Sequence, residues 1–236
     1  YKLDSKLQPS ENPVAETENV RTVIPTAGIH HFALITYVKN PVLWDPDTPE
    51  LYRVVVRVSK NDDTEDVIET NFGFRTLEFT ARDGFHLNGK KVEVKGVCNH
   101  HDLGALGAAF NTRAAQRQLE ILREMGCNAI RTSHNPPAPE LLDLCDKMGF
   151  LVMDEAFDAW MTPKLSLDYN KQFPAWQAED LKALVRRDRN HPSVFLWSIG
   201  NEVYDQDKPA LSKALNMIVK SEDITRPVTA GCDQPE

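Results

Sequence analysis

Residues 194–202 read VFLWSIGNE, an apolar run that passes directly into Asn201 and Glu202. An apolar run of this length, rich in β-branched and aromatic residues, is typical of a buried β-strand. A carboxylate after a strand is most often a helix cap or a first-turn residue. Here, however, two polar residues follow the strand without an intervening loop. The pattern therefore indicates that the strand presents both side chains at its carboxyl end.

Strands and helices alternate on both sides of this run. The predicted helices have apolar residues at helical spacing, and the first two stop at Gly126 and Gly149, which are placed as C-caps. The helices cover residues 111–126, 139–149, 175–190 and 209–223. The strands cover residues 90–97, 128–133, 150–156, 194–202 and 227–231. Strands separated by helices in this way require a parallel sheet with right-handed crossovers.

Two parallel architectures compete for this region. A doubly wound nucleotide-binding sheet usually has a glycine-rich phosphate turn after its first strand, whereas residues 98–107 read CNHHDLGALG, without GxGxxG. A (β/α)8 TIM barrel, whose chemistry lies at the carboxyl ends of its strands, is the better interpretation. Four complete units and the start of a fifth make half a barrel, which cannot close. We therefore interpret residues 81–236 as the truncated N-terminal half of a catalytic α/β barrel, an internal piece of a longer protein.

Residues 1–80 have a different pattern, that of an antiparallel β-domain. Short runs rich in β-branched and aromatic residues predict strands, and a polar segment of hairpin type, SKNDDTED at residues 59–66, follows the last of them. The runs are TVIP at 22–25, IHHFALITYV at 29–38 and LYRVVVRV at 51–58. An immunoglobulin-like β-sandwich, truncated at its start, fits best, although without a Cys-Trp-Cys pattern the label rests on strand count. Its expected role is to brace the barrel.

The composition excludes several classes of function. The 236 residues are 41% hydrophobic and 26% charged, as in an ordinary globular protein. The formal net charge of −8 argues against a polyanion, and no basic run with interleaved aromatic residues predicts nucleic-acid binding. No apolar stretch reaches the roughly 20 residues that span a bilayer, so no membrane partner is expected. The four cysteines have no CxxC or Cys/His ligand spacing, and no metal site is assigned.

Polar side chains collect just past the ends of the predicted strands. These residues are Asn99, His100, His101 and Asp102, then Arg131, Ser133, His134 and Asn135, then Asp154, Glu155 and Asp158, and finally Asn201 and Glu202. In a barrel, all these carboxyl ends converge on one mouth. Asp205 and Asp207 are instead expected to be cap or first-turn residues of the next helix. His191 is expected to organise the turn before the fourth strand. The histidines lack the HxH or HExxH spacing that would support a zinc site.

The strand-end residues suit acid–base chemistry on a sugar. A carboxylic acid beside an asparagine and several His or Arg donors can protonate a leaving oxygen. Retaining glycosidases place two carboxyl groups about 5–5.5 Å apart, one as acid/base and the other as nucleophile. The asparagine could hydrogen-bond a sugar hydroxyl, an interaction that strengthens in the transition state. Trp160 and Trp176 could offer an apolar face to a sugar ring, whereas filling of the barrel interior is at least as good an interpretation for Trp197.

Three sequence blocks together resemble glycoside hydrolase family 2, notably its β-galactosidase branch. They are RDRNHPSVFLWSIGNE at 187–202, IRTSHNPPAPELLDLCDKMGFLVMDEA at 130–156 and KGVCNHHD at 95–102. The resemblance covers about residues 40–236, and the blocks are specific in combination. It implies an immunoglobulin-like domain before a (β/α)8 barrel, with the first block leading into the fourth barrel strand.

The resemblance also implies roles for individual residues. Glu202 matches the general acid/base, Asn201 a residue that contacts the sugar, and His134 a residue of the sugar-binding subsite. The complete set of predicted substrate-binding residues is Asn201, His134, His101, Asp102, Asp158 and Trp160. The first-strand tip CNHHD departs from the Asn-Arg-His-Glu string of the best-known galactosidases. The family's nucleophile is a second glutamate on a later strand, outside this chain.

The expected activity is hydrolysis of terminal β-glycosidic bonds by retaining double displacement, with a β-galactosidase as the leading interpretation. A β-glucuronidase, a β-mannosidase and a non-catalytic carbohydrate-binding or scaffolding unit remain open. The expected partner is an oligosaccharide or β-glycoside, and a homo-oligomer is an open alternative. No cofactor is expected to be required, although some galactosidases of the family bind magnesium through the acid/base glutamate. The chain alone is expected to be inactive without the missing half-barrel.

Overall fold

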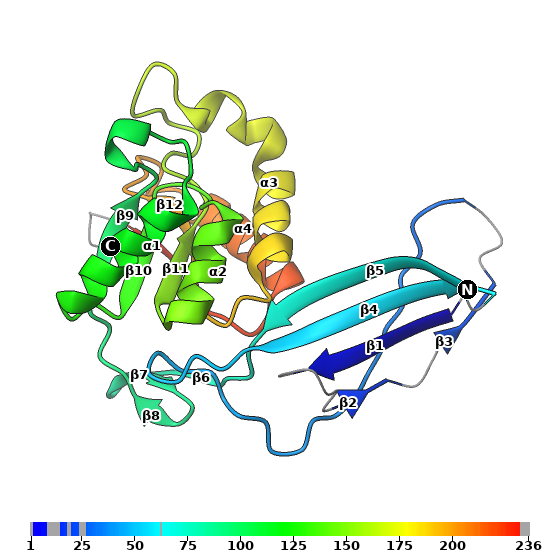
Figure 1. Cartoon of the computed structure of the whole chain (residues 1–236). Coiled ribbons are helices and arrows are strands. Elements are labelled where there is room, and N and C mark those ends of the chain that lie inside the picture. The colour runs from blue at the N-terminus through cyan, green and yellow to red at the C-terminus, as the bar shows by residue number, and fades with distance from the viewer. Residues whose placement is uncertain (1, 9–14, 18–19, 24–26, 62, 232–236) are drawn as a thin grey trace.

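The computed structural model describes residues 2–8, 15–17, 20–23, 27–61 and 63–231. These residues form an antiparallel sheet of five strands, a small antiparallel sheet of three and a parallel sheet of five. Figure 1 shows the first sheet extending away from the parallel sheet and its helices. No helix among the described residues is long and apolar enough to cross a membrane.

The first sheet is built around one long hairpin. Its strands are β1 (Lys2–Gln8), β2 (Ala15–Glu16), β3 (Val20–Arg21), β4 (Tyr52–Lys60) and β5 (Asp63–Phe72). The order is β2-β1-β4-β5, and β3 also pairs with β1. The strand predicted at residues 51–58 is confirmed as β4. Of the polar segment after it, Ser59 and Lys60 extend β4, and residues 63–66 begin β5.

The predicted sandwich is only partly seen. Residues 29–38, expected to be a strand, have no regular structure, and Ile29 and Tyr37 are 88% and 90% exposed. These apolar side chains have no facing layer to bury them, so the alternation of residue types does not produce a strand here. The run at 22–25 lies partly outside the described residues. The described strands up to Phe72 form one sheet, and the second sheet of an immunoglobulin-like sandwich is not among them.

A small sheet crosses the predicted domain boundary at residues 80 and 81. It contains β6 (Leu77–Thr80), β7 (Gly84–Leu87) and β8 (Lys90–Lys91). Phe85 and Leu87 of β7 pack with Trp44, Leu151 and Phe195 in one hydrophobic cluster. The indole N–H of Trp44, which is fully buried, donates to the backbone oxygen of Asp146 at 2.9 Å. Trp44 and β7 therefore cover the amino-terminal ends of the parallel strands, which we call the floor of the sheet.

The parallel sheet fits the predicted partial barrel. Its strands are β9 (Gly96–His100), β10 (Ala129–Ser133), β11 (Leu151–Glu155), β12 (Val194–Asn201) and β13 (Val228–Gly231). They lie side by side in chain order, whereas the order in a doubly wound sheet reverses at a switch point. The first strand begins at Gly96, later than predicted, because Lys90 and Lys91 pair in the small sheet instead.

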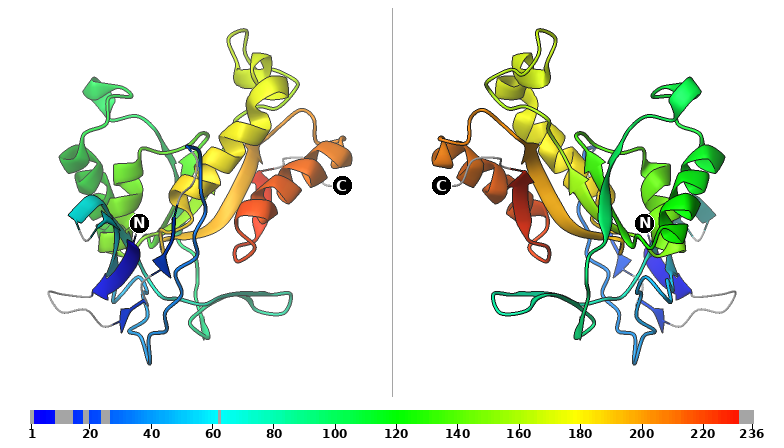
Figure 2. Two further views of the ribbon diagram at one scale, coloured as in Figure 1. Left: turned by 90° about the vertical axis from the view of Figure 1, so that its right-hand side faces the viewer. Right: turned by 90° about the vertical axis from the view of Figure 1, so that its left-hand side faces the viewer.

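Four helices connect these strands, as predicted. They are α1 (Thr112–Glu124), α2 (Pro139–Met148), α3 (Phe173–Asp188) and α4 (Pro209–Glu222), with short 3-10 turns η1 (Gly104–Leu106) and η2 (Tyr169–Lys171) in two loops. Right-handed crossovers in a constant direction place all helices on one face of the sheet. Figure 2 shows the helices along the outer side of the curved sheet.

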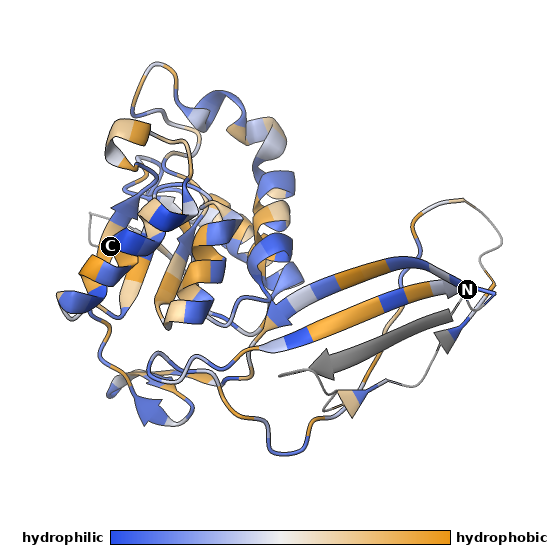
Figure 3. Cartoon of the chain, viewed as in Figure 1, coloured by the Kyte–Doolittle hydropathy of each residue, from blue (hydrophilic) through white to orange (hydrophobic). Residues whose placement is uncertain are grey.

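The main core lies between the sheet and the helices. Ile130, Val152 and Val194 point from the strands toward Leu142 and Leu215 of the helices. In Figure 3 the parallel strands are largely orange, while the helices carry both colours, as expected of helices with one buried face. Alternate residues of a strand face opposite sides of the sheet. A strand-end residue that faces this outer layer therefore cannot point into the mouth.

Trp197 is a core residue, but not in the barrel interior. It is 1% exposed and belongs to the core layer shared with the helices. Its indole N–H donates to Asp223 at 2.9 Å, and the guanidinium of Arg226 lies 5.5 Å from the ring centroid. The prediction of a structural role is therefore confirmed, and the predicted side of the sheet is corrected.

The end of α2 shows why a glycine is required at residue 149. Gly149 caps the helix in the left-handed conformation, with φ at 70°. A Cβ atom built there would lie 2.2 Å from the backbone oxygen of Pro46, in the segment that covers the floor. Gly126, after α1, also has a positive φ of 89°, but nothing lies within 4 Å of a Cβ atom there.

We predict that Gly149→Ala destabilises the protein much more than Gly126→Ala. Gly126→Ala should cost about 1–2 kcal/mol, the conformational penalty alone, whereas Gly149→Ala must also displace the segment at Pro46. Thermal unfolding of the full-length gene product, followed by tryptophan fluorescence, measures both. Equal melting temperatures for the two variants would show that the contact with Pro46 does not hold the floor in place.

Candidate active site

A buried carboxylate at the end of β11 organises the strand-end residues. Glu155 is fully buried, and its Oε2 accepts hydrogen bonds from Arg131 Nε at 2.9 Å and Ser198 Oγ at 2.6 Å. Its Oε1 lies 2.6 Å from His134 Nδ1. Since a carboxylate only accepts, the proton of the His134 imidazole is assigned to Nδ1. Residues of β10, β11 and β12 are thus joined at one carboxyl group.

A chain of polar contacts runs from Arg131 across the mouth. Arg131 NH2 donates to Asn201 Oδ1 at 2.7 Å, and Asn201 Nδ2 donates to Asp158 Oδ1 at 2.8 Å. These two contacts fix the orientation of the Asn201 amide, because its oxygen must face the arginine. Gly231, at the end of β13, leaves room for Arg131, since a Cβ atom there would lie 2.7 Å from Arg131 NH2.

The charges along this chain alternate in sign, which stabilises each of them. Burial lowers the pKa of Arg131, but its hydrogen bond and ion pair with Glu155 outweigh burial and raise that pKa above its ordinary value. Burial raises the pKa of Asp158, but the hydrogen bonds from Lys164 and Asn201 outweigh it, so the pKa is lowered. Both shifts favour the charged forms of Arg131 and Asp158 at neutral pH.

Glu202 lies at the end of this arrangement with a strained backbone. Its side chain is exposed, and its φ is +42°. A residue with a Cβ atom held in this region costs on the order of 1–3 kcal/mol and persists only where the surroundings fix it. The backbone N–H of Glu202 donates to the backbone oxygen of Gly231. Such local strain is frequent at catalytic positions.

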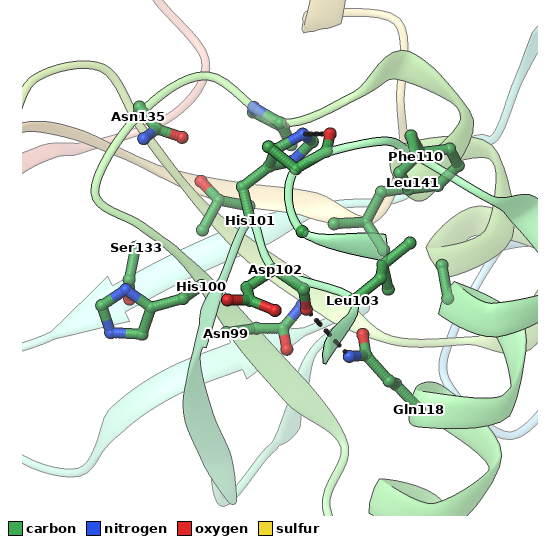
Figure 4. Close-up of a pocket in the computed structure, with 15 residues that line it drawn as sticks. Asn99, His100, His101, Asp102, Leu103, Phe110, Gln118, Ser133, Asn135 and Leu141 are labelled. Carbon is green, nitrogen blue, oxygen red and sulfur yellow. Dashed lines mark hydrogen bonds between the residues drawn. The ribbon is translucent and has the colours of Figure 1, made fainter. Parts of the chain in front are cut away.

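His101 and Asp102 lie in a separate pocket at the end of β9. Figure 4 shows this pocket, which Asn99, Phe110 and Asn135 also line. His101 Nε2 lies 3.1 Å from the backbone oxygen of Ala108, and Asp102 Oδ1 accepts from Gly104 N at 2.6 Å. Both side chains therefore already contact the loop that surrounds the pocket.

His134 and Asp158 line a larger cavity of about 530 Å³ between the end of β10 and the loop before η2. Cavities of this size commonly hold small-molecule ligands. Glu202 is not among the lining residues. His134 also contacts the first pocket indirectly, because its ring meets that of His100 edge-to-face at 5.0 Å. The β9 and β10 ends thus lie beside each other, as the barrel prediction requires.

Two of the strand-end and aromatic predictions need correction. Trp160 is 2% exposed, packs in the main core and donates its indole N–H to Ile199 O at 2.7 Å, so its ring offers no free face to a sugar. Trp176, on the first turn of α3, is 55% exposed and keeps an accessible ring. Asp154 faces the helices and not the mouth, because it is the neighbour of Glu155 on the strand.

His191 and Asp205, on either side of β12, have structural contacts. His191 Nδ1 lies 2.6 Å from Asp146 Oδ2, and Asp146 Oδ1 accepts from Ser193 N, so His191 does organise the turn before β12. Asp205 is buried and accepts from Thr162 in the neighbouring loop. It is not the α4 cap, because the N-cap of α4 is Lys208.

The described residues offer Glu202 no set of metal ligands. A group with suitable spacing contains Asp143, Asp146 and His191, at the opposite end of the sheet. Two of its members are already hydrogen-bonded to each other. Among the described residues, therefore, no group of three such ligands lies around Glu202.

Comparison with known proteins identifies the family. The model of the glycosyl hydrolases family 2 TIM barrel domain matches residues 79–234, and a second model, glycosyl hydrolases family 2, matches residues 2–75. This chain belongs to glycosyl hydrolase family 2. The resemblance seen in the three sequence blocks is thereby confirmed, as is the partial barrel with a β-domain before it.

Relatives within family 2 carry two activity names. Beta-galactosidase BoGH2A of Bacteroides ovatus is 51% identical over 84% of this chain, and a putative beta-glucuronidase of Formosa agariphila is 42% identical over 84%. A solved family 2 structure from Bacteroides cellulosilyticus superposes with a TM-score of 0.89 at 40% identity, over 98% of this chain. The chain spans only 27%, 19% and 30% of the lengths of these three proteins.

Two contributors to the site could not be recognised from the sequence. Ser198 lies inside an apolar strand, and the period-two alternation that places it on the face of Glu155 is the only signal for it. Lys164 lies in the long loop after β11, where no periodic pattern exists, and it reaches Asp158 Oδ1 at 2.7 Å. Arg131 and Glu155 were recognised as strand-end residues, but their direct ion pair was not predicted.

We predict that Glu155→Gln destabilises the barrel by about 3–5 kcal/mol, the usual cost of breaking a buried ion pair from one side. The amide would turn one acceptor into a donor facing Arg131 or His134. Ser198→Ala removes one neutral donor from the same carboxylate and should cost about 1.5–3 kcal/mol. Denaturant unfolding of the full-length gene product compares the two. A loss from Glu155→Gln no larger than that from Ser198→Ala would contradict the central role of this carboxylate.

A second buried acid, Asp154, makes stability depend on pH. It is fully buried, and no described group donates to either of its carboxylate oxygens. Burial and the neighbouring carboxylate of Asp188 both raise the pKa of Asp154 well above its ordinary value. Protonated Asp154 can donate to Asp188, which itself accepts two hydrogen bonds from Arg187. Because the folded-state pKa is raised, this stabilisation is present at low pH and is lost as pH rises through that pKa.

We predict that Asp154→Asn removes this pH dependence, since its amide donates to Asp188 at every pH. Its stability relative to wild type should increase with pH between the ordinary and the raised pKa of Asp154, by up to about 1.4 kcal/mol per pH unit, and should level off above the raised pKa. Thermal unfolding at a series of pH values from about 4 upward measures this. Asp205→Asn is the control, because the lowered pKa of Asp205 confines its titration to acidic pH. Parallel curves for wild type and Asp154→Asn would refute the prediction.

Proposed function

We propose that the full-length gene product hydrolyses terminal β-galactosides with retention of configuration, and that Glu202 is its acid/base. The proposal is carried by one observation: Glu202 is exposed at the end of β12, while Asn201 beside it is buried and held by Arg131 and Asp158. The carboxyl group is free to meet a substrate, and its neighbour is rigid. The similarity to a β-galactosidase of Bacteroides ovatus supports the substrate class.

In this mechanism Glu202 first protonates the glycosidic oxygen while a carboxylate from outside this chain attacks the anomeric carbon. The same residue, now ionised, then removes a proton from the water that hydrolyses the glycosyl–enzyme intermediate. Asn201 has a second amide N–H beyond the one that donates to Asp158, and this N–H is available for a sugar hydroxyl. His134 and Asp158, which line the cavity, are proposed to contact the sugar as well.

Both cations of the described network are paired. Arg131 is paired with Glu155, and Lys164 is paired with Asp158, so neither of these two is left to bind the carboxylate of a glucuronide. A galactosidase is preferred to a glucuronidase because BoGH2A, at 51% identity, is more similar to this chain than the putative beta-glucuronidase of Formosa agariphila, at 42%. A panel of aryl β-glycosides assayed with the full-length gene product decides between the sugars.

We predict that Glu202→Gln slows substrates with poor leaving groups by about 10²–10⁴-fold, the usual contribution of a general acid. Activated aryl β-galactosides, which need little protonation, should be slowed much less in the first step. Azide should restore turnover of the intermediate and yield a β-galactosyl azide. Glu179→Gln, at an exposed glutamate of α3, is the matched control. An equal loss on all substrates without azide rescue would exclude Glu202 as the acid/base.

A further inference from the structure

Lys164 contacts the backbone that carries Glu202. Its Nζ donates to Asn201 O at 2.6 Å and to Asp158 Oδ1 at 2.7 Å. The lysine side chain is 16% exposed, so its ammonium group is largely withdrawn from water and needs these acceptors. Lys164 comes from the loop between β11 and η2, which crosses to the end of β12 at this point.

The peptide between Asn201 and Glu202 is therefore held at both of its polar atoms. Its oxygen accepts from Lys164, and its N–H donates to Gly231 O. The φ of Glu202, at +42°, is unfavourable for a residue with a side chain. Fixing the peptide plane on both sides keeps the backbone in this conformation. The direction of the Glu202 side chain follows from it.

We propose that Lys164 is a positioning residue for the acid/base, holding the Asn201–Glu202 peptide so that the Glu202 carboxyl group points at the glycosidic oxygen. This inference rests on the proposed function. Asp158 completes the arrangement, because it neutralises Lys164 and also accepts from the side chain of Asn201. The lysine thus acts on the proton donor through the main chain, without touching the substrate.

A second lysine near the site provides a matched control. Lys208 Nζ pairs with Asp205 Oδ1 at 2.5 Å, also beyond the end of β12. Like Lys164, Lys208 is paired with an aspartate. Its Nζ donates to this carboxylate and not to the Asn201–Glu202 peptide. A general effect of losing a lysine–aspartate pair beside the site should appear in both lysine variants.

The test compares Lys164→Met and Lys208→Met in the full-length gene product. If Lys164 positions the Glu202 carboxyl group, Lys164→Met should lower kcat/KM for β-galactosides with poor leaving groups about tenfold to a hundredfold. A small misplacement of a catalytic group has an effect of this size. Activated aryl β-galactosides should change little, and Lys208→Met should leave both substrate classes near wild type. Lys164→Gln, whose amide is one bond short of the lysine nitrogen, should show the same selectivity.

A double-mutant cycle separates positioning from structural support. In a Glu202→Gln background, Lys164→Met should add little further loss on poor leaving groups, because the group it positions is absent. A full additive loss, an equal loss on both substrate classes, or unfolding of both Lys164 variants would overturn the proposal. If Glu202→Gln itself shows no dependence on the leaving group, the proposed function fails. If Glu202→Gln shows that dependence and Lys164→Met does not, only the role of Lys164 fails.

Discussion

The carboxylate of Glu155 has no contact with solvent, so its oxygens must be matched by protein donors. Those donors come from β10 and β12, the two neighbours of β11. Arg131, His134 and Ser198 can all reach it only when three parallel strands end at the same level. The buried charge therefore links the register of the sheet to the geometry of the mouth. Arg131, which Glu155 holds, in turn donates to Asn201 at the end of β12.

From Glu155 the contacts continue as an alternation of charge. Arg131 is shared between Glu155 and Asn201, Asn201 between Arg131 and Asp158, and Asp158 between Asn201 and Lys164. An asparagine in this position is oriented without ambiguity, because a cation faces its oxygen and an anion faces its amide. The neighbouring strand residue, Asp154, faces the helices. No described group donates to its carboxylate, and another carboxylate, that of Asp188, lies near it. One strand thus carries a fully hydrogen-bonded acid on its inner side and, on its outer side, an acid whose pKa is raised well above its ordinary value.

Much of this arrangement could be predicted from the sequence. The alternation of strands and helices predicted the parallel sheet, and the polar residues after each strand predicted where the site lies. The face of the sheet was harder to predict than the position along the strand. Trp197 was expected in the barrel interior and Asp154 at the mouth, whereas both face the helices. A strand has a period of two, but the sequence alone does not say which of the two faces is the mouth. Lys164 was missed for another reason, since a loop residue acquires its partners only when the loop folds back.

The floor of the sheet has a consequence for synthesis on the ribosome. Trp44 leaves the ribosome early, but the backbone oxygen that its indole binds belongs to a residue 102 positions later in the chain. Its apolar neighbours Leu151 and Phe195 are translated later still. The indole therefore has no hydrogen-bond acceptor until two of the five parallel strands have been made, and its apolar surroundings are complete only with the fourth. The β-rich part and the barrel part mature together, and not as consecutive independent units.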